Sequence, residues 1–303
     1  MTKLLVIIAG PTASGKTRLA IDLALHFKTE IISADSRQFY KELSIGTAKP
    51  SEAELREVPH HFINSHSVTE NVTAGTYEKE VHKLLDTLFQ KNDVVIMAGG
   101  SGLYIEAVIN GIDELPERNA EIRTGLDELY KSGGLPALQE KMKSLDPEGY
   151  TMIDVNNPRR LIRALEITLA SSTPYSSLLG KKVKQHSWEW LMAGIDWPRA
   201  ELYKRINERT AEMIRAGLKT EVEEVITHRD MNSLSTVGYK EMFDHIDGKT
   251  TLEEATELIA QHTRNYAKRQ LTWFRRYSEM IWMQPGDEMK LVKIIQETIS
   301  SNE

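Results

Sequence analysis

The chain has 303 residues, of which 40% are hydrophobic and 27% charged, so it can bury the core of one large or two modest globular domains. The absence of cysteine excludes disulfides, a catalytic thiol and any cysteine-ligated zinc. The formal net charge of −6 argues against a protein that coats nucleic acid non-specifically. We find neither a secretory leader nor an apolar run of membrane-spanning length, so we expect a cytoplasmic protein.

The first third of the chain alternates strand and helix patterns. The apolar residues 3–9 predict a buried strand, residues 16–27 an amphipathic helix, and residues 30–34 a second short strand. A strand, a helix and a strand within about 30 residues form a parallel βαβ unit. A further helix over 74–91 and a strand over 94–98 extend it, which predicts an α/β fold with a doubly wound parallel sheet.

A glycine-rich loop with the pattern G-x-x-x-x-G-K-[ST] lies between the first strand and the first helix. It consists of Gly10, Pro11, Thr12, Ala13, Ser14, Gly15, Lys16 and Thr17. In this context the glycines let the backbone wrap a phosphate chain, the lysine adds a positive charge, and the threonine can hold a magnesium ion. The loop predicts a P-loop-type site for a di- or triphosphate, but it does not say which bond breaks.

Asp35 is an acidic residue that directly follows the predicted strand 30–34. P-loop hydrolases also carry an acid that helps hold magnesium and water, whereas here the strand 94–98 is followed by a glycine-rich turn, which disfavours a motor or GTPase-type enzyme. A carboxylate at the end of a strand, beside the phosphate loop, could accept a proton from a nucleophile. The alternative is that Asp35 caps the turn at Ser36. The sequence leaves both interpretations open.

From about residue 115 the pattern changes to helices separated by proline and glycine, and residues 190–195 again form a strand pattern. We therefore expect a discontinuous P-loop core, formed by residues 1–114 and 187–303. A mainly helical insertion at 115–186 would interrupt it.

Two segments are basic although the whole chain is acidic. Between Asn156 and His186 a single acid, Glu166, stands against six basic residues, and between His262 and Arg276 five basic residues occur without an acid. The first six are Arg159, Arg160, Arg163, Lys181, Lys182 and Lys184. These segments suggest a bounded site for a polyanion.

Residues 199–210 predict a helix that places Arg205 and Arg209 on one face. Two guanidinium groups in this arrangement could clamp a pyrophosphate. Alternatively, Glu201 and Arg205 could form an ordinary surface ion pair. We interpret Trp197, which precedes this helix, as a core residue.

Taken together, these features resemble the tRNA dimethylallyltransferases (tRNA isopentenyltransferases) of bacterial type. The matching segments occur in the family's order and cover nearly the whole chain. They are GPTASGKT at 10–17, DSRQFY at 35–40, GTAKP at 46–50, AGGSGLY at 98–104, DVNNPRRLIRALE at 154–166, LYKRINERTAEMIRAGLKTEV at 202–222, VGYKE at 237–241 and TRNYAKRQLTWFR at 263–275.

The resemblance implies transfer of a dimethylallyl group from dimethylallyl diphosphate to N6 of the adenosine immediately 3′ of the anticodon, with Mg²⁺ as cofactor. The P-loop would then hold the leaving pyrophosphate rather than ATP. It also implies that Asp35 takes the proton from N6, that Thr17 supports magnesium and pyrophosphate, and that Arg209 contacts the diphosphate. The positions that match tRNA-contacting ones are Asp35, Ser36, Arg37, Gln38, Ser101, Arg123, Arg159, Arg160, Leu161, Ile162 and Arg163. We expect a monomer.

Three positions depart from the family pattern. Ser101 stands where threonine is usual and keeps the hydroxyl, Phe39 replaces a common valine, and Phe62-Ile63-Asn64 replaces Leu-Ile-Asp. We therefore assign no catalytic role to residues 60–64.

Two other functions fit parts of the pattern. A small-molecule or nucleotide kinase would use the P-loop for ATP and Asp35 to activate a hydroxyl group. An RNA-binding module with a vestigial loop would bind tRNA in a salt-dependent way without turnover.

Overall fold

The computed structural model describes residues 2–113, 115–180 and 185–300. The chain divides into two compact units, of which unit 1 comprises Met1–Ile109 and Gln185–Glu303 and unit 2 comprises Asn110–Lys184. Lys181, Lys182 and Lys184, which contribute to the first basic segment, lie outside the described residues. The two units are described separately below.

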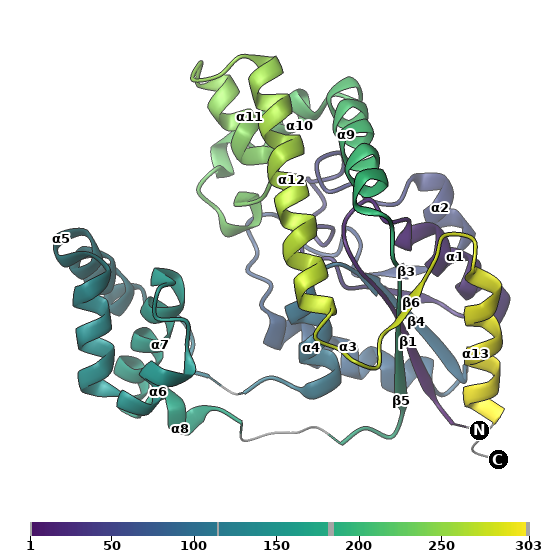
Figure 1. The fold of residues 1–303 in the computed structure, drawn as a ribbon, viewed down its shortest axis with the longest axis horizontal. Coiled ribbons are helices and arrows are strands. Elements are labelled where there is room, and N and C mark those ends of the chain that lie inside the picture. Colours follow the sequence, from purple (N-terminus) through teal and green to yellow (C-terminus); the bar gives the residue numbers. More distant parts are fainter. Residues whose placement is uncertain (1, 114, 181–184, 301–303) are drawn as a thin grey trace. The chain divides into compact units, whose positions relative to one another are not determined.

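Unit 1 is built on a six-stranded parallel sheet with the strand order β3-β2-β4-β1-β5-β6 (Figure 1). The strands are β1 (Leu4–Ala9), β2 (Ile31–Ser33), β3 (His60–His61), β4 (Val94–Gly99), β5 (Glu189–Ile195) and β6 (Ile281–Met283). The central strand β1 is buried along its whole length, which is why it is apolar without alternation. The predicted α/β fold with a doubly wound parallel sheet is confirmed.

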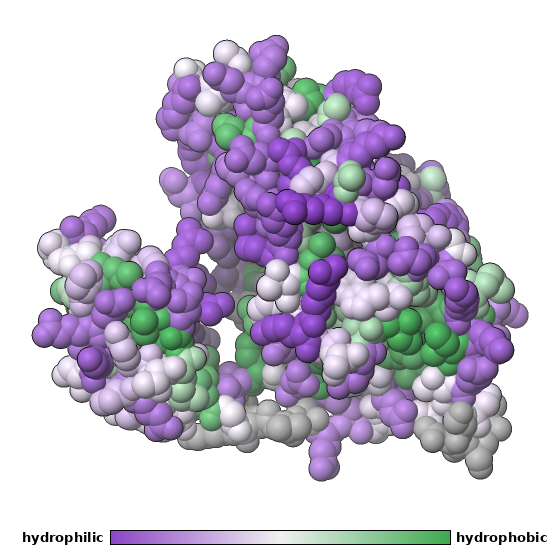
Figure 2. All heavy atoms as spheres, viewed as in Figure 1, coloured by the Kyte–Doolittle hydropathy of each residue, from purple (hydrophilic) through white to green (hydrophobic). Residues whose placement is uncertain are grey.

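Helices of unit 1 cover both faces of this sheet. They are α1 (Lys16–Phe27), α2 (Glu52–Glu57), α3 (Ala74–Leu88), α4 (Gly102–Asn110), α9 (Arg199–Arg215), α10 (Leu218–Glu224), α11 (Tyr239–Ile246), α12 (Leu252–Phe274) and α13 (Glu288–Ser300), with short 3₁₀ turns at Ile226–His228 and Asn232–Leu234. None of the helices in the described part of the chain is long and apolar enough to cross a membrane. On the face shown in Figure 2, hydrophilic side chains dominate the surface over α9 and α12.

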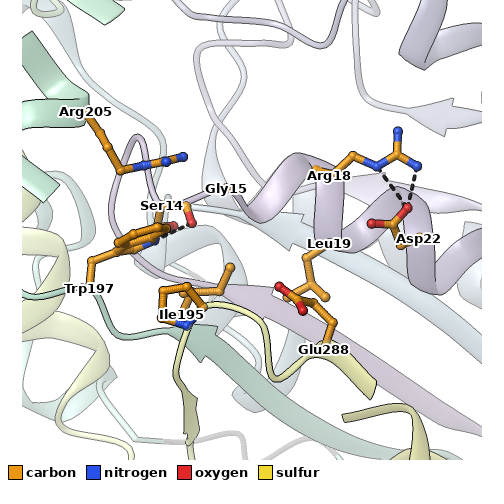
Figure 3. A pocket seen from close by; sticks show the side chains of 10 residues that line it. Ser14, Gly15, Arg18, Leu19, Asp22, Ile195, Trp197, Arg205 and Glu288 are labelled. Atoms are coloured by element: carbon orange, nitrogen blue, oxygen red, sulfur yellow. Dashed lines mark hydrogen bonds and ion pairs between the residues drawn. The ribbon is translucent and has the colours of Figure 1, made fainter. Parts of the chain in front are cut away.

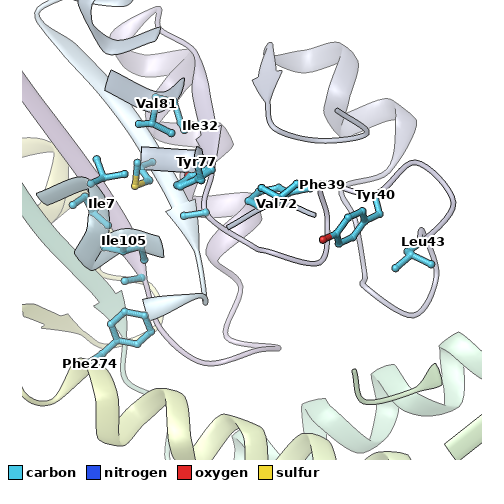
Figure 4. Packing of buried hydrophobic residues seen from close by; sticks show 14 of the residues in the cluster. Ile7, Ile32, Phe39, Tyr40, Leu43, Val72, Tyr77, Val81, Ile105 and Phe274 are labelled. Atoms are coloured by element: carbon cyan, nitrogen blue, oxygen red, sulfur yellow. The ribbon is translucent and has the colours of Figure 1, made fainter. Parts of the chain in front are cut away.

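The side chains of β1 alternate between two apolar cores. Ile7 packs on one face with Phe39, Tyr77 and Phe274, so this core joins α3 and α12 to the sheet (Figure 4). Ile8, its neighbour, packs on the other face against α1 and α13. Because α1, α3, α12 and α13 pack on the sheet through these cores, the loops at the carboxyl ends of the strands have fixed supports.

A buried carboxylate links three segments of unit 1 that are far apart in the sequence. Glu221 accepts hydrogen bonds from the backbone N–H groups of Ser44 (2.8 Å), Ile45 (2.6 Å) and Gly46 (2.9 Å), and from the hydroxyl of Tyr239 (2.6 Å). An added Cβ at Gly46 would come within 2.6 Å of the Tyr239 ring. This junction therefore brings together residues from three of the segments that match the family pattern, at 46–50, 202–222 and 237–241.

Unit 2 is a small helical bundle. It contains α5 (Ala120–Leu145), α6 (Pro147–Met152), α7 (Pro158–Ser171) and α8 (Tyr175–Leu178). Gly134, with φ 64° and ψ −163°, interrupts α5, in agreement with the expectation that glycine and proline separate the helices of this region. The side chain of Asn157 accepts hydrogen bonds at the start of α7, and apolar residues of α5 and α7 form the core.

Candidate active site at the carboxyl edge of the sheet

The P-loop connects the carboxyl end of β1 to the start of α1. Gly10 and Gly15 have φ values of 139° and 92°, which glycine adopts without steric strain, and Ala13 also lies in the left-handed region at φ 64°. The Nζ atom of Lys16 donates a hydrogen bond to the carbonyl oxygen of Pro11 at 2.6 Å. Because α1 begins at Lys16, its first backbone N–H groups have no partner within the helix and can bind an anion.

Three charged side chains interact at this edge. The pKa of Lys16 is lowered to about 8, chiefly by burial; the carboxylate of Asp35 opposes the shift, and the positive charge of Arg209 adds to it. Burial likewise lowers the pKa of Arg209, again opposed by Asp35. The structure therefore brings together the P-loop lysine, the strand-end carboxylate and the α9 arginine that the sequence singled out.

Asp35 lies just beyond the carboxyl end of β2. Its Oδ1 atom accepts a hydrogen bond from the backbone N–H of Arg37 at 3.0 Å, so the turn-capping alternative describes a real contact. This contact uses one lone pair of one oxygen, and a carboxylate has about four acceptor sites. Capping the turn and accepting a proton are therefore compatible roles for this side chain.

A pair of hydroxyl groups connects the loops after β2 and β4. The Oγ atom of Ser101 accepts a hydrogen bond from the backbone N–H of Ser36 at 3.0 Å and donates one to Ser36 Oγ at 3.2 Å. The close approach of these loops requires glycine at position 99, where an added Cβ would lie 2.2 Å from the Ala34 carbonyl oxygen. Ser101, which replaces the usual threonine, thus fixes the segment that carries Asp35.

Two arginines of α9, Arg205 and Arg209, contact the P-loop in different ways. Arg209 Nη2 donates to the hydroxyl of Thr12 at 2.6 Å, whereas Arg205 Nε donates to the carbonyl oxygen of Ala13 at 2.8 Å. Glu201 forms no ion pair with Arg205 within the described ranges. Both arginines reach the P-loop, and Arg209 also interacts with Asp35.

Arg37 and Gln38 hold neighbouring loops. Arg37 Nη1 donates to the carbonyl oxygens of Asn232 and Ser233 at 2.9 and 3.1 Å. Gln38 Nε2 donates to the carbonyl oxygens of Thr47 and Ala48 at 3.2 and 3.1 Å. The contact of these two side chains with tRNA stays a prediction. The structure shows that both also hold loops within unit 1.

In unit 2, two of the predicted RNA-contacting arginines are free to reach solvent and two are engaged. Arg159 and Arg160 are exposed in the first turn of α7. Arg163 lies 3.2 Å from the buried carboxylate of Glu166 and donates to the Pro116 carbonyl oxygen, and Arg123 lies 3.6 Å from the same carboxylate. Arg163 and Arg123 therefore also neutralise a buried charge inside unit 2.

Two of the residues predicted to contact tRNA have buried side chains, and their contact with tRNA stays a prediction. The side chains of Leu161 and Ile162 are 0% and 4% exposed, because they belong to the apolar core between α5 and α7. A run of five consecutive helical residues cannot present all its side chains on one surface, since successive residues are about 100° apart around the helix. These two residues position the arginines that flank them.

Three residues that contribute to the site gave no chemical signal in the sequence. Gln270 joins two loops, because its Oε1 accepts from the backbone N–H of Thr12 at 2.9 Å and its Nε2 donates to the Gly100 carbonyl oxygen at 2.9 Å. Tyr266 interacts with Ser101, and burial together with the charge of Asp35 raises the pKa of its hydroxyl. Trp197 is only half-buried and donates to the P-loop, although we expected it in the core.

The residues present fit a magnesium ion that takes most of its ligands from the diphosphate and from water, and few from the protein. The described residues contain no group of three histidines, aspartates or glutamates that could hold a metal. Magnesium commonly keeps several waters and takes one or two protein ligands together with phosphate oxygens. The hydroxyl of Thr17, at the start of α1, could supply such a ligand.

The comparisons with known proteins agree with this geometry. The family model described as IPP transferase matches residues 38–277. The chain is 47% identical to the tRNA dimethylallyltransferase of Christiangramia forsetii, over 96% of each chain, and 43% identical to that of Cytophaga hutchinsonii, over 98% of this chain and 97% of the relative.

Solved structures show the same fold. The tRNA isopentenylpyrophosphate transferase from Bacillus halodurans has a TM-score of 0.73 and 34% identity, with 99% of this chain and 97% of that one covered. A eukaryotic dimethylallyltransferase that acts on tRNA has a TM-score of 0.83, with 99% of this chain and 80% of that one covered. At 22% identity the second likeness concerns the fold alone.

Proposed function

Because the chain belongs to the IPP transferase family, we propose that it is a tRNA dimethylallyltransferase. It transfers the dimethylallyl group of dimethylallyl diphosphate to N6 of the adenosine immediately 3′ of the anticodon and releases pyrophosphate. It acts in the cytoplasm as a monomer. The observation that carries this proposal is the placement of Asp35, just beyond β2, at the same edge of the sheet as the P-loop, where Arg209 donates to Thr12 and where Asp35 interacts with Lys16 and Arg209.

The reaction needs a base that accepts the proton from N6 and, opposite it, groups that bind the leaving diphosphate. The exocyclic nitrogen of adenine is a poor nucleophile, so it must be held in line with the allylic carbon while the diphosphate leaves. The new C–N bond forms as the allylic C–O bond breaks, and the Asp35 carboxylate accepts the proton from N6. The loop N–H groups, Lys16 and Arg209 stabilise the charge that develops on the diphosphate. A bound magnesium ion, with Thr17 among its ligands, would add further positive charge there.

The target base has to leave the anticodon loop to reach Asp35. Extruding an unpaired loop base costs only about a few kcal/mol, because no Watson–Crick pair is broken. Arg159 and Arg160 are exposed on unit 2 and suit phosphate oxygens of the stem-loop. Unit 2 thus supplies binding to RNA, while unit 1 supplies the chemistry.

The reaction is tested by incubating the protein with Mg²⁺, unmodified tRNA and dimethylallyl diphosphate carrying label in the allylic group. We expect the label in tRNA, and nuclease digestion should place it on the adenosine 3′ of the anticodon. A kinase would instead transfer the γ-phosphate of ATP and leave the tRNA unlabelled. An RNA-binding module would bind tRNA and produce neither product.

The pKa of Lys16 predicts how substrate capture depends on pH. With a value near 8 in the free protein, the ammonium form is lost as the pH rises through 8, and with it the attraction for diphosphate. If only the charged form binds, kcat/KM for dimethylallyl diphosphate should be level below about pH 7 and about 30-fold lower at pH 9.5. Lys49, whose pKa burial also lowers to about 8, provides the control, and Lys49→Gln should keep the same profile. A profile that is level to pH 9.5, or that becomes level in Lys49→Gln, contradicts the assignment.

The exposed arginines of α7 predict the salt dependence of RNA binding. Replacing both Arg159 and Arg160 with glutamine should weaken tRNA binding and reduce the slope of log K against log salt by about 2, one per lost phosphate contact. The measurement is a filter-binding titration at several salt concentrations. The double change Lys131→Gln and Lys143→Gln removes two exposed charges from α5 and should leave the slope unchanged. Equal slopes for both double variants would remove α7 from the RNA site.

A further inference from the structure

The P-loop is bonded on its outer face by two side chains that the reaction itself does not use. Arg205 Nε donates to the carbonyl oxygen of Ala13 at 2.8 Å, and Trp197 Nε1 donates to the carbonyl oxygen of Ser14 at 2.9 Å. The guanidinium carbon of Arg205 lies 4.5 Å from the centroid of the Trp197 ring, so the two side chains also stack. Figure 3 shows both side chains beside the part of the loop that carries Ser14 and Gly15.

This stacked pair borders solvent and does not merely fill the core. Trp197 and Arg205 line a pocket of about 190 Å³ together with Ser14, Gly15 and Ile195. On the far side of the pocket Arg18 is paired with Asp22 (Figure 3). At the border of this pocket, Arg205 and Trp197 thus bond two consecutive carbonyl oxygens of the P-loop.

Peptide geometry links those carbonyls to the inner face of the loop. In a planar trans peptide the C=O of one residue and the N–H of the next point in opposite directions. A carbonyl of Ala13 that is held outward directs the N–H of Ser14 inward, and the outward carbonyl of Ser14 does the same for the N–H of Gly15. Ala13 has φ 64°, which is uncommon for a residue with a side chain, so the loop needs external contacts to keep this shape.

We propose that Arg205 and Trp197 are positioning residues that keep the backbone N–H groups of Ser14 and Gly15 directed at the diphosphate. The inference rests on the proposed function, because it takes the diphosphate as the occupant of the loop. If a carbonyl turned inward, its partial negative charge would repel the diphosphate where an N–H group should bind it. Arg209, one helical turn further along α9, serves the Asp35 side of the same loop through Thr12.

Two substitutions separate this role from a general effect of charge. Arg205→Ala removes the bond to Ala13 and the stacking partner of Trp197. Trp197→Phe keeps the charge of Arg205 and an aromatic ring but removes the N–H donated to Ser14. Arg199→Ala is the matched control, because Arg199 lies on the same helix and stacks on Tyr203 at 5.1 Å, away from the P-loop.

The measurements are the KM for dimethylallyl diphosphate, kcat, the Kd of pyrophosphate by calorimetry, and the Kd of tRNA. Arg205→Ala should raise the KM and the pyrophosphate Kd about 10- to 100-fold, as expected for the loss of a hydrogen bond to a charged group. Trp197→Phe should raise both by about 3- to 10-fold, the loss of one neutral hydrogen bond. In both variants kcat should change less than the KM, and the Kd of tRNA should stay at the wild-type value. Arg205→Lys should recover part of the loss, because an ammonium group can donate to Ala13 but stacks less well.

Three results would overturn the proposal. One is pyrophosphate affinity in Arg205→Ala equal to that of the wild type. Another is a wild-type Kd in Trp197→Phe, which would leave the charge of Arg205 as the only cause. The third is an equal loss in Arg199→Ala, which would point to general destabilisation of α9. Wild-type protein that binds pyrophosphate but transfers nothing to tRNA would contradict the proposed function instead, so the two failures are distinguishable.

Discussion

Replacing Asp35 with asparagine should lower kcat by about 10²- to 10⁴-fold, the range that general acid–base catalysis contributes. The amide keeps the size of the side chain and can still accept the hydrogen bond from the N–H of Arg37, but it cannot take the proton from N6. The measurement is single-turnover transfer with saturating tRNA and dimethylallyl diphosphate. The affinity for tRNA should change by no more than a few-fold, because the lost interaction belongs to the transition state.

Asp86→Asn is the matched control for this substitution, since Asp86 is exposed on α3. It should transfer the dimethylallyl group at the wild-type rate. If Asp35→Asn lost binding of tRNA and rate in equal measure, the carboxylate would be a binding group. If it kept the wild-type rate, Asp35 would serve only as the cap of its turn.

Replacing Arg209 with alanine should lower kcat/KM for dimethylallyl diphosphate by about 10²- to 10³-fold, as for the loss of one preorganised donor to a developing anion. Arg209 donates to Thr12 in the P-loop and interacts with Asp35, so its charge lies where the diphosphate leaves. Because the negative charge on the leaving group grows in the transition state, kcat should fall as well as the affinity. Steady-state kinetics with varied dimethylallyl diphosphate measures both effects.

Arg215→Ala provides the comparison, because Arg215 is exposed in the last turn of the same helix. Its kinetic constants should equal those of the wild type. Equal losses in both variants would show that α9 as a whole had been destabilised. An unchanged kcat in Arg209→Ala would restrict this arginine to ground-state binding.

Features encoded within a short stretch of chain could be predicted from the sequence. The P-loop needs only a strand, a glycine-rich loop and a helix in succession, and the position of Asp35 at the edge of the sheet follows from the strand that precedes it. The strands β3 and β6, with two and three residues, carry too little periodicity for such a prediction, whereas β2, also three residues long, was predicted because a strand, the P-loop and a helix precede it.

Features that depend on packing between distant elements could not be predicted. The different tasks of Arg205 and Arg209 depend on how α9 lies against the P-loop, and the bonds of Gln270 depend on α12 packing beside it. Leu161 and Ile162 match tRNA-contacting positions of the family, and only the core of unit 2 shows that their side chains are buried. Helical periodicity was the signal in the sequence that could have indicated their burial.

The central claim is that the P-loop holds the diphosphate that leaves during C–N bond formation. The most direct test is a crystal structure with an unreactive dimethylallyl diphosphate analogue whose bridging oxygen is replaced by sulfur. We expect the diphosphate within hydrogen-bond distance of the N–H groups of residues 13–17 and of Arg209, with the allylic carbon toward Asp35. An analogue bound elsewhere, with the P-loop unoccupied, would contradict it.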